Sequence, residues 1–384
     1  MALAIMTSHA DTQPAPPVAT LGSVMKGPGG RATGFDYLRL ILAVAVVLTH
    51  SIDVTYGFAY GSAVESGLLR PFFAIILPMF FALSGFLVAG SLERCRTLVS
   101  FVGLRLIRLL PALIFETALA ALLLGPLLTK LPLWDYFQDP LFLGYFANIR
   151  GDIRYLLPGL FEANPWPSTV NAQLWTLPYE LACYLTLLGL AVLGIHRKRA
   201  LFVIFTAGLN AALLAQDVYA GNFNPTAVIS GKELVLCFLY GIAIYLYRNE
   251  IRHSAKLGSL ACVLALALLI HPATDYLVPA VAAYLTVYLG LLRPAKTALV
   301  TSGDYSYGIF LYGFPVQQAV VQLLGPANQH WYWNLALALP VTLAFAMLSW
   351  HRIEEPALAL RSQLNKFEDS LLAVSQPPAK TSAV

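Results

Sequence analysis

Long runs of hydrophobic residues, separated by short polar stretches, dominate the pattern along this chain. Runs of about 17–25 residues are what an α-helix needs to cross roughly 30 Å of hydrocarbon. We place ten such segments, at residues 35–52, 72–92, 104–127, 172–194, 200–216, 229–247, 257–271, 276–292, 305–324 and 333–350. The pattern predicts an all-α fold, a polytopic membrane helix bundle of about ten transmembrane helices.

Composition strengthens this prediction. Of the 384 residues, 58% are hydrophobic and only 11% are charged, and the mean hydropathy is +0.69. A soluble domain of this length cannot hide so much apolar surface in its core. Most of the surface is therefore expected to face lipid.

The basic residues predict the orientation, because translocated loops beside membrane helices are poor in Lys and Arg. With a cytoplasmic N-terminus, 19 of the 24 basic residues fall on the inner side or its boundary. The remaining outer ones are Arg70, Lys130, Arg150, Arg154 and Lys232. Both termini are thus predicted to be cytoplasmic. The net charge of +4 follows from this topology, and without a nucleic-acid motif we expect no nucleic-acid partner.

Polar stretches at both ends set the predicted domain limits. Residues 1–33 read as a disordered cytoplasmic tail, residues 34–356 as the membrane domain, and residues 357–384 as a second cytoplasmic tail. The cysteines form no CxxC pair and have no neighbouring histidine, so we expect neither a disulfide framework nor a metal site. They are Cys95, Cys183, Cys237 and Cys262.

The first hydrophobic segment contains two ionisable residues on one helical face. Arg39 and His50 are eleven residues apart, which is close to three helical turns and roughly 16 Å along the axis. Such groups are costly inside a membrane, on the order of 2.5–3.5 kcal/mol on insertion scales, so they suggest a functional site. A positioned imidazole is a natural general base for a hydroxyl nucleophile. The alternative is a buried histidine that only satisfies a hydrogen bond.

Glu180 strengthens the catalytic interpretation. If its helix enters from the outer face near Asn171, nine residues bring the carboxylate about 14 Å down, near the depth of His50. A carboxylate that orients an imidazole is a recurring partner in acyl transfer. The sequence thus predicts that Glu180 and His50 meet in mid-membrane. A structural ion pair, or the proton relay of a transporter, is the alternative.

Arg105 and Arg108 lie three residues apart at the cytoplasmic start of the third segment. With Arg39 they predict a cationic cluster suited to the phosphates of a nucleotide-like donor, because the guanidinium fork matches phosphate oxygens. Positive-inside anchoring is the alternative.

The longest outer loop, residues 128–171, is rich in aromatic residues among prolines and mixed charges. Long loops of this kind are often lids or binding segments, and these side chains suit stacking on sugars. An aromatic belt at the membrane interface explains them equally well.

Six motifs in order resemble the acyltransferase 3 family of membrane acyltransferases over residues 34–356. They are Arg39 and His50 with ten residues between them, FFALSGFLV at 80–88, RLIR at 105–108, LWTLPYELACY at 174–184, SYGIFLYGFP at 306–315 and IEEP at 353–356. Two departures occur: Thr176 and Pro178 vary the fourth motif, and Gly313 stands where many members carry a histidine. The resemblance also suggests a stand-alone membrane acyltransferase domain without an appended esterase-like domain.

The resemblance implies O-acylation, usually O-acetylation, of extracytoplasmic carbohydrate with cytoplasmic acetyl-CoA as donor, in a bacterial inner membrane. It implies that His50 is the essential histidine, as general base or as acyl relay, and that Glu180 is the acidic residue of the fourth motif. It further implies that Arg39 shares the histidine motif and that Arg105 and Arg108 engage coenzyme A. The expected partners are a carbohydrate or glycolipid acceptor and membrane lipid.

A multi-helix transporter or flippase of a glycan or lipid-linked substrate would also place ionisable residues at mid-membrane. Its polar residues would be spread over several helices, whereas here they concentrate in the first, third and fourth. A scaffold without chemistry gives no reason for charged groups at depth.

Overall fold

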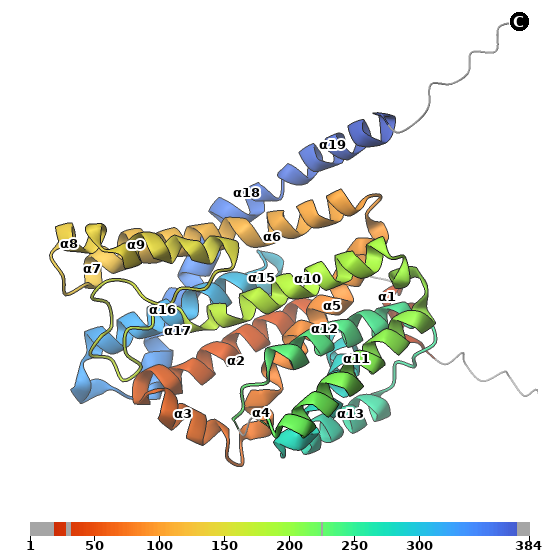
Figure 1. The fold of residues 1–384 in the computed structure, drawn as a ribbon, viewed down its shortest axis with the longest axis horizontal. Helices are drawn as coiled ribbons and strands as arrows, with labels where there is room; N and C mark the ends of the chain where they lie inside the picture. Colours follow the sequence, from red (N-terminus) through yellow and green to blue (C-terminus); the bar gives the residue numbers. More distant parts are fainter. Residues whose placement is uncertain (1–18, 28–31, 224–225, 375–384) are drawn as a thin grey trace, which may run out of the picture.

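The computed structural model describes residues 19–27, 32–223 and 226–374, and over these residues the fold is helical without a β-sheet (Figure 1). The first half comprises α1 (Leu21–Met25), α2 (Gly34–Tyr56), α3 (Phe58–Glu65), α4 (Arg70–Ala74), α5 (Ile76–Arg94), α6 (Leu98–Leu119), the π-helix η1 (Ala120–Leu124), α7 (Gly125–Leu128), α8 (Leu133–Gln138), α9 (Pro140–Tyr145) and the 3₁₀-helices η2 (Phe146–Arg150) and η3 (Ala172–Thr176). The second half comprises α10 (Leu177–Val192), η4 (Ile195–Arg197), α11 (Arg199–Ala220), α12 (Gly231–Leu246), α13 (Ala255–Leu268), η5 (Pro272–Leu277), α14 (Val278–Gly290), α15 (Ala298–Thr301), α16 (Ser306–Leu324), η6 (Pro326–Asn328), α17 (Trp331–Ser349), the π-helix η7 (Trp350–Glu354), α18 (Glu355–Ala357) and α19 (Leu360–Val374). The predicted all-α class is confirmed.

Six of the described helical stretches are long and apolar enough to cross a membrane. They are Gly34–Tyr56, Arg70–Arg94, Leu98–Leu128, Ala172–Val192, Arg199–Ala220 and Trp331–Ser370. The four other predicted segments are also helical, as α12, α13, α14 and α16, but three are short and the glutamines of α16 lower its hydropathy. A multi-pass membrane bundle is therefore supported, while the count of ten spans stays a prediction.

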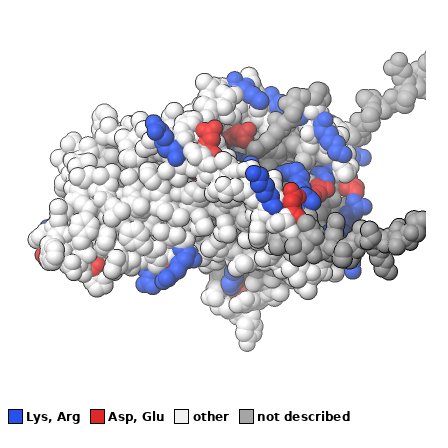
Figure 2. All heavy atoms as spheres, turned by 90° about the horizontal axis from the view of Figure 1, so that it is seen from above, with Lys and Arg blue, Asp and Glu red and all other residues white. Residues whose placement is uncertain are grey.

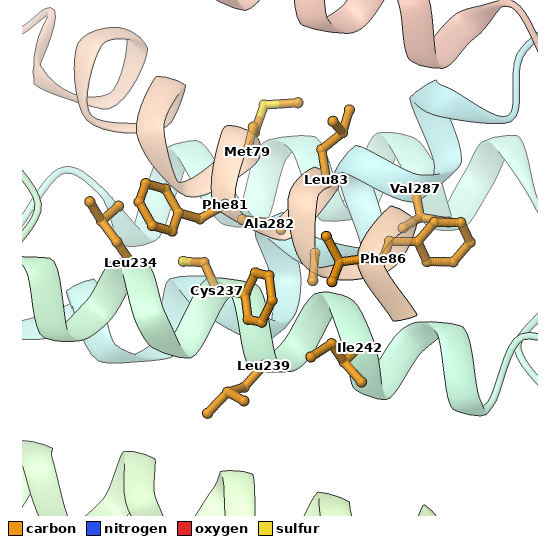
Figure 3. Packing of buried hydrophobic residues seen from close by; sticks show 14 of the residues in the cluster. Met79, Phe81, Leu83, Phe86, Leu234, Cys237, Leu239, Ile242, Ala282 and Val287 are labelled. Carbon is orange, nitrogen blue, oxygen red and sulfur yellow. The ribbon is translucent and has the colours of Figure 1, made fainter. Parts of the chain in front are cut away.

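Close packing of α5 on α12 forms the centre of the bundle. Gly85 of α5 lies against the backbone carbonyl of Phe238, and Gly241 of α12 lies against that of Ala82. Small residues allow membrane helices to approach this closely, which compensates for the weak hydrophobic drive between helices in lipid. Around these contacts Phe86 and its neighbours interlock with side chains of α12 and α14 (Figure 3).

Charge is distributed unevenly over the molecular surface. On the face shown in Figure 2, most Lys, Arg, Asp and Glu side chains gather toward the right, and much of the remaining surface is uncharged. Apolar side chains point outward from the bundle, such as Ile204 on α11 and Val263 on α13, which are 67% and 66% exposed. This distribution fits a bundle with lipid-facing sides.

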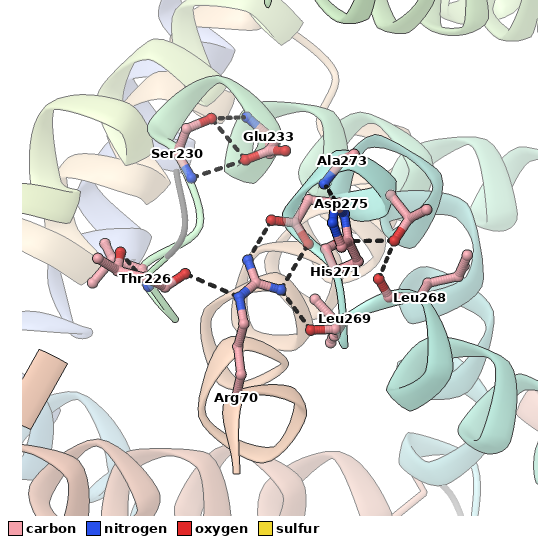
Figure 4. A network of polar contacts seen from close by, with 11 residues as sticks. Arg70, Thr226, Ser230, Glu233, Leu268, Leu269, His271, Ala273 and Asp275 are labelled. Carbon is pink, nitrogen blue, oxygen red and sulfur yellow. Dashed lines mark hydrogen bonds and ion pairs between the residues drawn. The ribbon is translucent and has the colours of Figure 1, made fainter. Parts of the chain in front are cut away.

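A buried arginine ties the two halves of the chain together near α4. Arg70, only 2% exposed, donates both Nη atoms to Asp275, at 3.1 Å and 2.5 Å, and its Nε to the carbonyl of Thr226 at 3.1 Å (Figure 4). Breaking such a pair from one side typically costs about 3–5 kcal/mol. This residue, predicted as an outer-loop cation, is thus a structural crosslink.

The long loop after α7 is folded rather than extended. Tyr136 is fully buried and donates its hydroxyl to the carbonyl of Ala121 at 2.7 Å, and Tyr145 is also fully buried. These two aromatics form a small core and do not serve as a membrane belt or a sugar platform. Trp166, by contrast, lines the pocket that contains His50.

Parts of both predicted tails are helical. Leu21 of α1 is fully buried and donates its backbone N–H to Ile251 at 2.9 Å. At the other end α19 runs beside α6, with Leu364 against Gly103 and an Arg96–Asp369 ion pair of 2.7 Å (Figure 1). Polar composition alone suggested a tail because it does not reveal the apolar face with which α19 packs on α6. Residues 1–18, 28–31 and 375–384 lie outside the described part.

Candidate active site

Three pockets adjoin one another along α2. The vestibule, about 730 Å³, lies at its N-terminal end beside Asp36; the inner pocket, about 210 Å³, follows; and the outer pocket, about 430 Å³, surrounds His50. The vestibule and inner pocket share Leu87 and three arginines in their walls. The inner and outer pockets share the neck, which we define as Leu77, Thr176 and Phe310.

All five predicted site residues line these pockets. The outer pocket contains His50, and the inner pocket contains Arg39, Arg105, Arg108 and Glu180, of which the three arginines also line the vestibule. The roles assigned to them stay predictions, but the structure brings them into one continuous region.

The inner arginines are held by carboxylates that the sequence analysis did not identify. Asp304, which precedes α16, pairs with Arg39 and, at 2.8 Å, with Arg108. Arg108 also pairs with Glu354 at 3.1 Å. The π-helix η7 inserts an extra residue into the turn that carries Glu354, a feature frequently found at functional sites. The arginine side chains are thereby fixed before any ligand binds.

Arg105 differs from its two neighbours. Its Nη2 donates to the Ser91 hydroxyl at 3.1 Å, its buried Nε has no hydrogen-bond partner, and among the described residues no carboxylate lies within ion-pair distance. This guanidinium is therefore the inner cation best able to bind an anion from outside the chain.

Glu180 lies in the inner pocket, where it accepts a hydrogen bond from Tyr184 at 2.5 Å. The carboxylate within hydrogen-bond distance of His50 is not Glu180 but Asp53. The predicted meeting of His50 and Glu180 is thus not made. The depth of a residue along a helix does not determine which neighbour its side chain faces.

Hydrogen bonds to a backbone carbonyl hold the start of α10 beside the neck. Pro315 has no N–H, so the carbonyl of Leu311 loses its normal helical partner. Gln173 donates to this carbonyl at 2.8 Å, and Asn171 at 3.3 Å, from the segment that leads into α10. Pro315 therefore frees the carbonyl that anchors the segment just before the fourth motif. This contact helps to place Thr176 in the neck.

In the outer pocket, His50 and Asp53 form a pair within α2. The His50 Nδ1 and the Asp53 Oδ2 are 3.2 Å apart, as the i, i+3 spacing on one helical face permits. Asp53 is 4% exposed. A β-carbon on Gly61 of α3 would overlap the Asp53 carboxylate, so the glycine provides the space for it.

Aromatic rings enclose the imidazole. The ring of Phe314 on α16 is centred 5.2 Å from His50, and that of Trp166 6.4 Å from it. Gln318 donates to the carbonyls of Trp166 and Thr169, at 2.9 Å and 2.8 Å, which fixes the end of the long loop over the pocket. The imidazole is thus held from three elements and kept partly away from solvent.

A second carboxyl group faces the outer pocket from the end of α3. Glu65 is 5% exposed. Burial, and secondly the negative charge of Asp53, raises the pKa of Glu65 to about 8. This carboxyl group therefore carries a proton at neutral pH.

The arrangement suits group transfer between two adjoining pockets. Cations and apolar walls at the inner end can hold an anionic donor with a long arm, while the imidazole–carboxylate pair at the outer end can take a proton from a hydroxyl. Among the described residues no cluster of three or more His, Cys, Asp or Glu could hold a metal ion.

Fold and site together define a multi-pass membrane protein with a transferase-like site. The family profile of the acyltransferase domain, Acyl_transf_3, matches residues 33–351. The chain belongs to the acyltransferase 3 family, and the predicted family is confirmed.

Two curated relatives match nearly their full length. Nodulation protein 10 of Rhizobium leguminosarum bv. viciae is 30% identical over 369 residues, covering 90% of this chain and 98% of the relative. The O-acetyl transferase of Shigella phage Sf6 is 26% identical over 352 residues, covering 85% and 96%. No solved structure gives a significant match. Family membership confirms the predicted enzyme class, acyltransferase, over a transporter.

Proposed function

We propose that this membrane acyltransferase moves an acetyl group from cytoplasmic acetyl-CoA to a hydroxyl of a cell-surface glycan, in the inner membrane of a bacterium. The observation that carries the proposal is the row of three adjoining pockets, basic at one end of α2 and imidazole-containing at the other. The name of the phage relative, an O-acetyl transferase, supports the choice of acyl group and of an oxygen acceptor.

The donor would bind from the vestibule. Its phosphates would contact Arg105 and the edges of Arg39 and Arg108, since guanidinium groups form charge-assisted hydrogen bonds with phosphate. Its narrow pantetheine arm would then run through the inner pocket, whose apolar walls include Phe80 and Leu87. The thioester would reach the neck, next to the outer pocket.

His50 would act on the acceptor hydroxyl. With Nδ1–H donated to Asp53, Nε2 has a free lone pair for the hydroxyl proton. The hydroxyl oxygen then attacks the thioester carbonyl carbon, the C–O bond forms and the C–S bond breaks. The proton held by His50 passes to the departing thiolate, so charge and atoms balance.

Glu180 would act on the donor side. It lies with Tyr184 in the inner pocket, near the path of the pantetheine arm, and not beside the imidazole. Its role is then to position the donor. Asp53 would orient the imidazole, which is the role that the sequence predicted for Glu180.

The first test uses the purified protein in lipid nanodiscs with acetyl-CoA labelled in the acetyl group. We expect release of free coenzyme A that depends on His50, through transfer or slow transfer to water. A protein that never consumes acetyl-CoA, with or without glycan acceptors, would refute the donor assignment.

A second test separates direct transfer from a covalent relay. In the relay, the imidazole first accepts the acetyl group and then passes it to the hydroxyl. Intact-protein and peptide mass spectrometry after incubation with acetyl-CoA alone would reveal acetyl on His50. Its absence during turnover leaves the general-base route.

The acceptor class is tested in cells. The acetyl content of surface glycans is compared between cells with and without this protein, and a strain carrying His50→Ala serves as control. Loss of acetate from one polymer supports the proposal, and unchanged acetylation of every surface glycan contradicts it.

A further inference from the structure

The vestibule carries more positive charge than the acids in its wall can neutralise. Asp304 pairs with Arg39 and Arg108, whereas among the described residues neither Arg105 nor Arg361 has a carboxylate within ion-pair distance. A cavity lined mainly by one sign of charge attracts ions of the opposite sign. The described wall contains five arginines and two aspartates, which are Arg39, Arg94, Arg105, Arg108 and Arg361, with Asp36 and Asp304.

One of these arginines comes from the C-terminal helix. Arg361 belongs to α19, which follows residues 33–351, the part of the chain that matches the family (Figure 1). Arg361 and Asn365 are one turn apart on one helical face, and both line the vestibule. Leu364 packs instead on Gly103 of α6. The docking of α19 on α6 therefore holds a polar face of this helix in the vestibule wall.

Arg361 lies among other cations. Its guanidinium is close enough to those of Arg105 and Arg108 for their charges to repel it. Arg94 lines the vestibule but not the inner pocket, as Arg361 does, yet it interacts electrostatically with the carboxylate of Glu93. Repulsion between unpaired guanidinium groups is relieved when an anion binds between them. Arg361 is thus placed to contact an anionic ligand.

The order of the groups along coenzyme A matches the order of these arginines. From the thioester outward, the donor carries the pantetheine arm, the diphosphate and then the ribose with its 3′-phosphate. Arg105 lines both the inner pocket and the vestibule, whereas Arg361 lines the vestibule alone. A donor whose thioester reaches the neck would therefore place its diphosphate near Arg105 and its 3′-phosphate near Arg361.

We propose that Arg361, with Asn365 beside it, binds the 3′-phosphate of the coenzyme A donor, so that α19 completes the donor site and selects coenzyme A over donors without this phosphate. The proposal rests on the proposed function and deepens it, because it assigns a specificity-determining residue to that site. A phosphate monoester carries a charge of about −1.5 to −2 at pH 7. The guanidinium fork can donate two parallel hydrogen bonds to its oxygens.

The experiment compares two donors that differ only in this phosphate, acetyl-CoA and acetyl-3′-dephospho-CoA. Release of free thiol is measured with wild type and Arg361→Gln in lipid nanodiscs. For wild type we expect a KM about tenfold higher with the dephospho donor, as one lost charge-assisted contact predicts, and a similar kcat. Arg361→Gln should raise the KM for acetyl-CoA about tenfold and leave that for the dephospho donor unchanged, because the contact is already missing there.

Two further variants locate the effect. Lys366→Gln is the matched control, because it removes one positive charge from the same helix and its side chain does not line the vestibule. It should leave both KM values unchanged. Arg361→Lys keeps the charge but loses the fork, so its KM for acetyl-CoA should be intermediate. A KM that rises equally for both donors in Arg361→Gln, or does not rise at all, would overturn the proposal.

A phospholipid headgroup offers the same phosphate chemistry as the nucleotide, and the membrane composition separates the two. The assay is repeated in nanodiscs of phosphatidylcholine alone and of phosphatidylcholine with phosphatidylglycerol. We expect the two donors to differ in both membranes. An effect of Arg361→Gln that occurs only in the anionic membrane would assign Arg361 to lipid and refute the proposal.

Calorimetric titration with coenzyme A and 3′-dephospho-coenzyme A separates this proposal from the proposed function. If acetyl-CoA is consumed but both ligands bind equally, the assignment of Arg361 fails and the proposed function stands. If coenzyme A binds about tenfold more tightly in a manner that depends on Arg361, but no acetyl group is ever transferred, the proposed function fails and the phosphate site stands.

Discussion

The vestibule and the outer pocket are lined by the same helix, yet they handle charge in opposite ways. At the inner end, Arg39 and Arg108 are held by Asp304, and Arg105 is left available. At the outer end, Asp53 and Glu65 have no cation near them in the described lining. The inner end is built to receive an anion, whereas the outer end repels one.

Under the proposed function, this difference would let one bundle distinguish donor from acceptor. A phosphate-bearing molecule is stabilised at one end and destabilised at the other, so each substrate is directed to its own pocket. Under the proposed function, the neck between them would be the place where the acyl group changes carrier.

Removing the imidazole should have the largest effect. His50→Ala deletes the proton acceptor of the outer pocket and should lower the rate of acyl transfer by up to about 10⁴-fold. Binding of acetyl-CoA at the inner end should be unchanged. Transfer rate and donor affinity, measured on the same preparation, check the prediction; wild-type turnover by this variant would remove His50 from the mechanism.

Asp53→Asn should produce the next largest loss, on the order of 10²-fold in kcat, because the imidazole loses the carboxylate that orients it and stabilises its protonated form. The variant keeps the shape of the side chain. Asp53→Glu should recover part of the rate if a carboxylate is what matters. Equal rates for wild type and Asp53→Asn would show that this carboxylate does not assist the imidazole.

Gly61→Ala tests the space that the Asp53 carboxylate occupies. The added methyl group would displace the carboxylate and should lower kcat by roughly tenfold, although alanine favours the helix by up to about 1 kcal/mol. Gly67→Ala is the matched control, because its β-carbon meets no atom closer than 3.4 Å. A loss of kcat shared by both variants would point to a general disturbance of the segment around α3 and not to displacement of the Asp53 carboxylate.

At the inner end, Arg105→Ala should raise the KM for acetyl-CoA by about tenfold with little change in kcat, as expected for one lost charge-assisted hydrogen bond. With S-acetyl-pantetheine, which lacks the nucleotide phosphates, wild type and variant should behave alike. Arg96→Ala, whose side chain pairs with Asp369 on the surface, is the control. An identical defect with both donors would contradict a phosphate contact.

The smallest effect concerns the proton on Glu65. The pKa of this group is raised to about 8, so between its ordinary value of 4.5 and about 8 the folded protein holds a proton that the unfolded chain has released. Stability should therefore fall as pH rises through this window and level off above it. Glu65→Gln should flatten that slope, reducing the change of the apparent melting temperature across the window by several degrees. The same pH dependence of stability in wild type and variant would show that a group other than Glu65 ionises in this window.

The sequence predicted the helical class and the family, and the five residues that it singled out line adjoining pockets. These succeeded because they depend on local pattern: apolar runs and residues such as Arg39 and His50, spaced along one helix. The pairing of His50 with Asp53 is equally local, since the residues are i, i+3, and inspection of that spacing could have found it.

Other parts of the site depend on long-range packing and could not be predicted from one sequence. Asp304 meets Arg39 across 265 positions of the chain. Glu65 enters the pocket only because α3 folds back after Gly57, where a positive φ of 91° turns the chain. Glu180 was assigned the wrong neighbour because spacing gives the depth of a residue and not the direction that it faces.

The neck has a consequence beyond catalysis. A membrane protein with pockets large enough for water toward both ends would dissipate the electrochemical gradient if those pockets merged into a continuous water-filled channel. Leu77 and Phe310 place hydrocarbon where the pockets meet, and ions avoid such constrictions because they cannot shed their hydration there. Under the proposed function, the neck would therefore serve both for passage of the acetyl group and for electrical insulation.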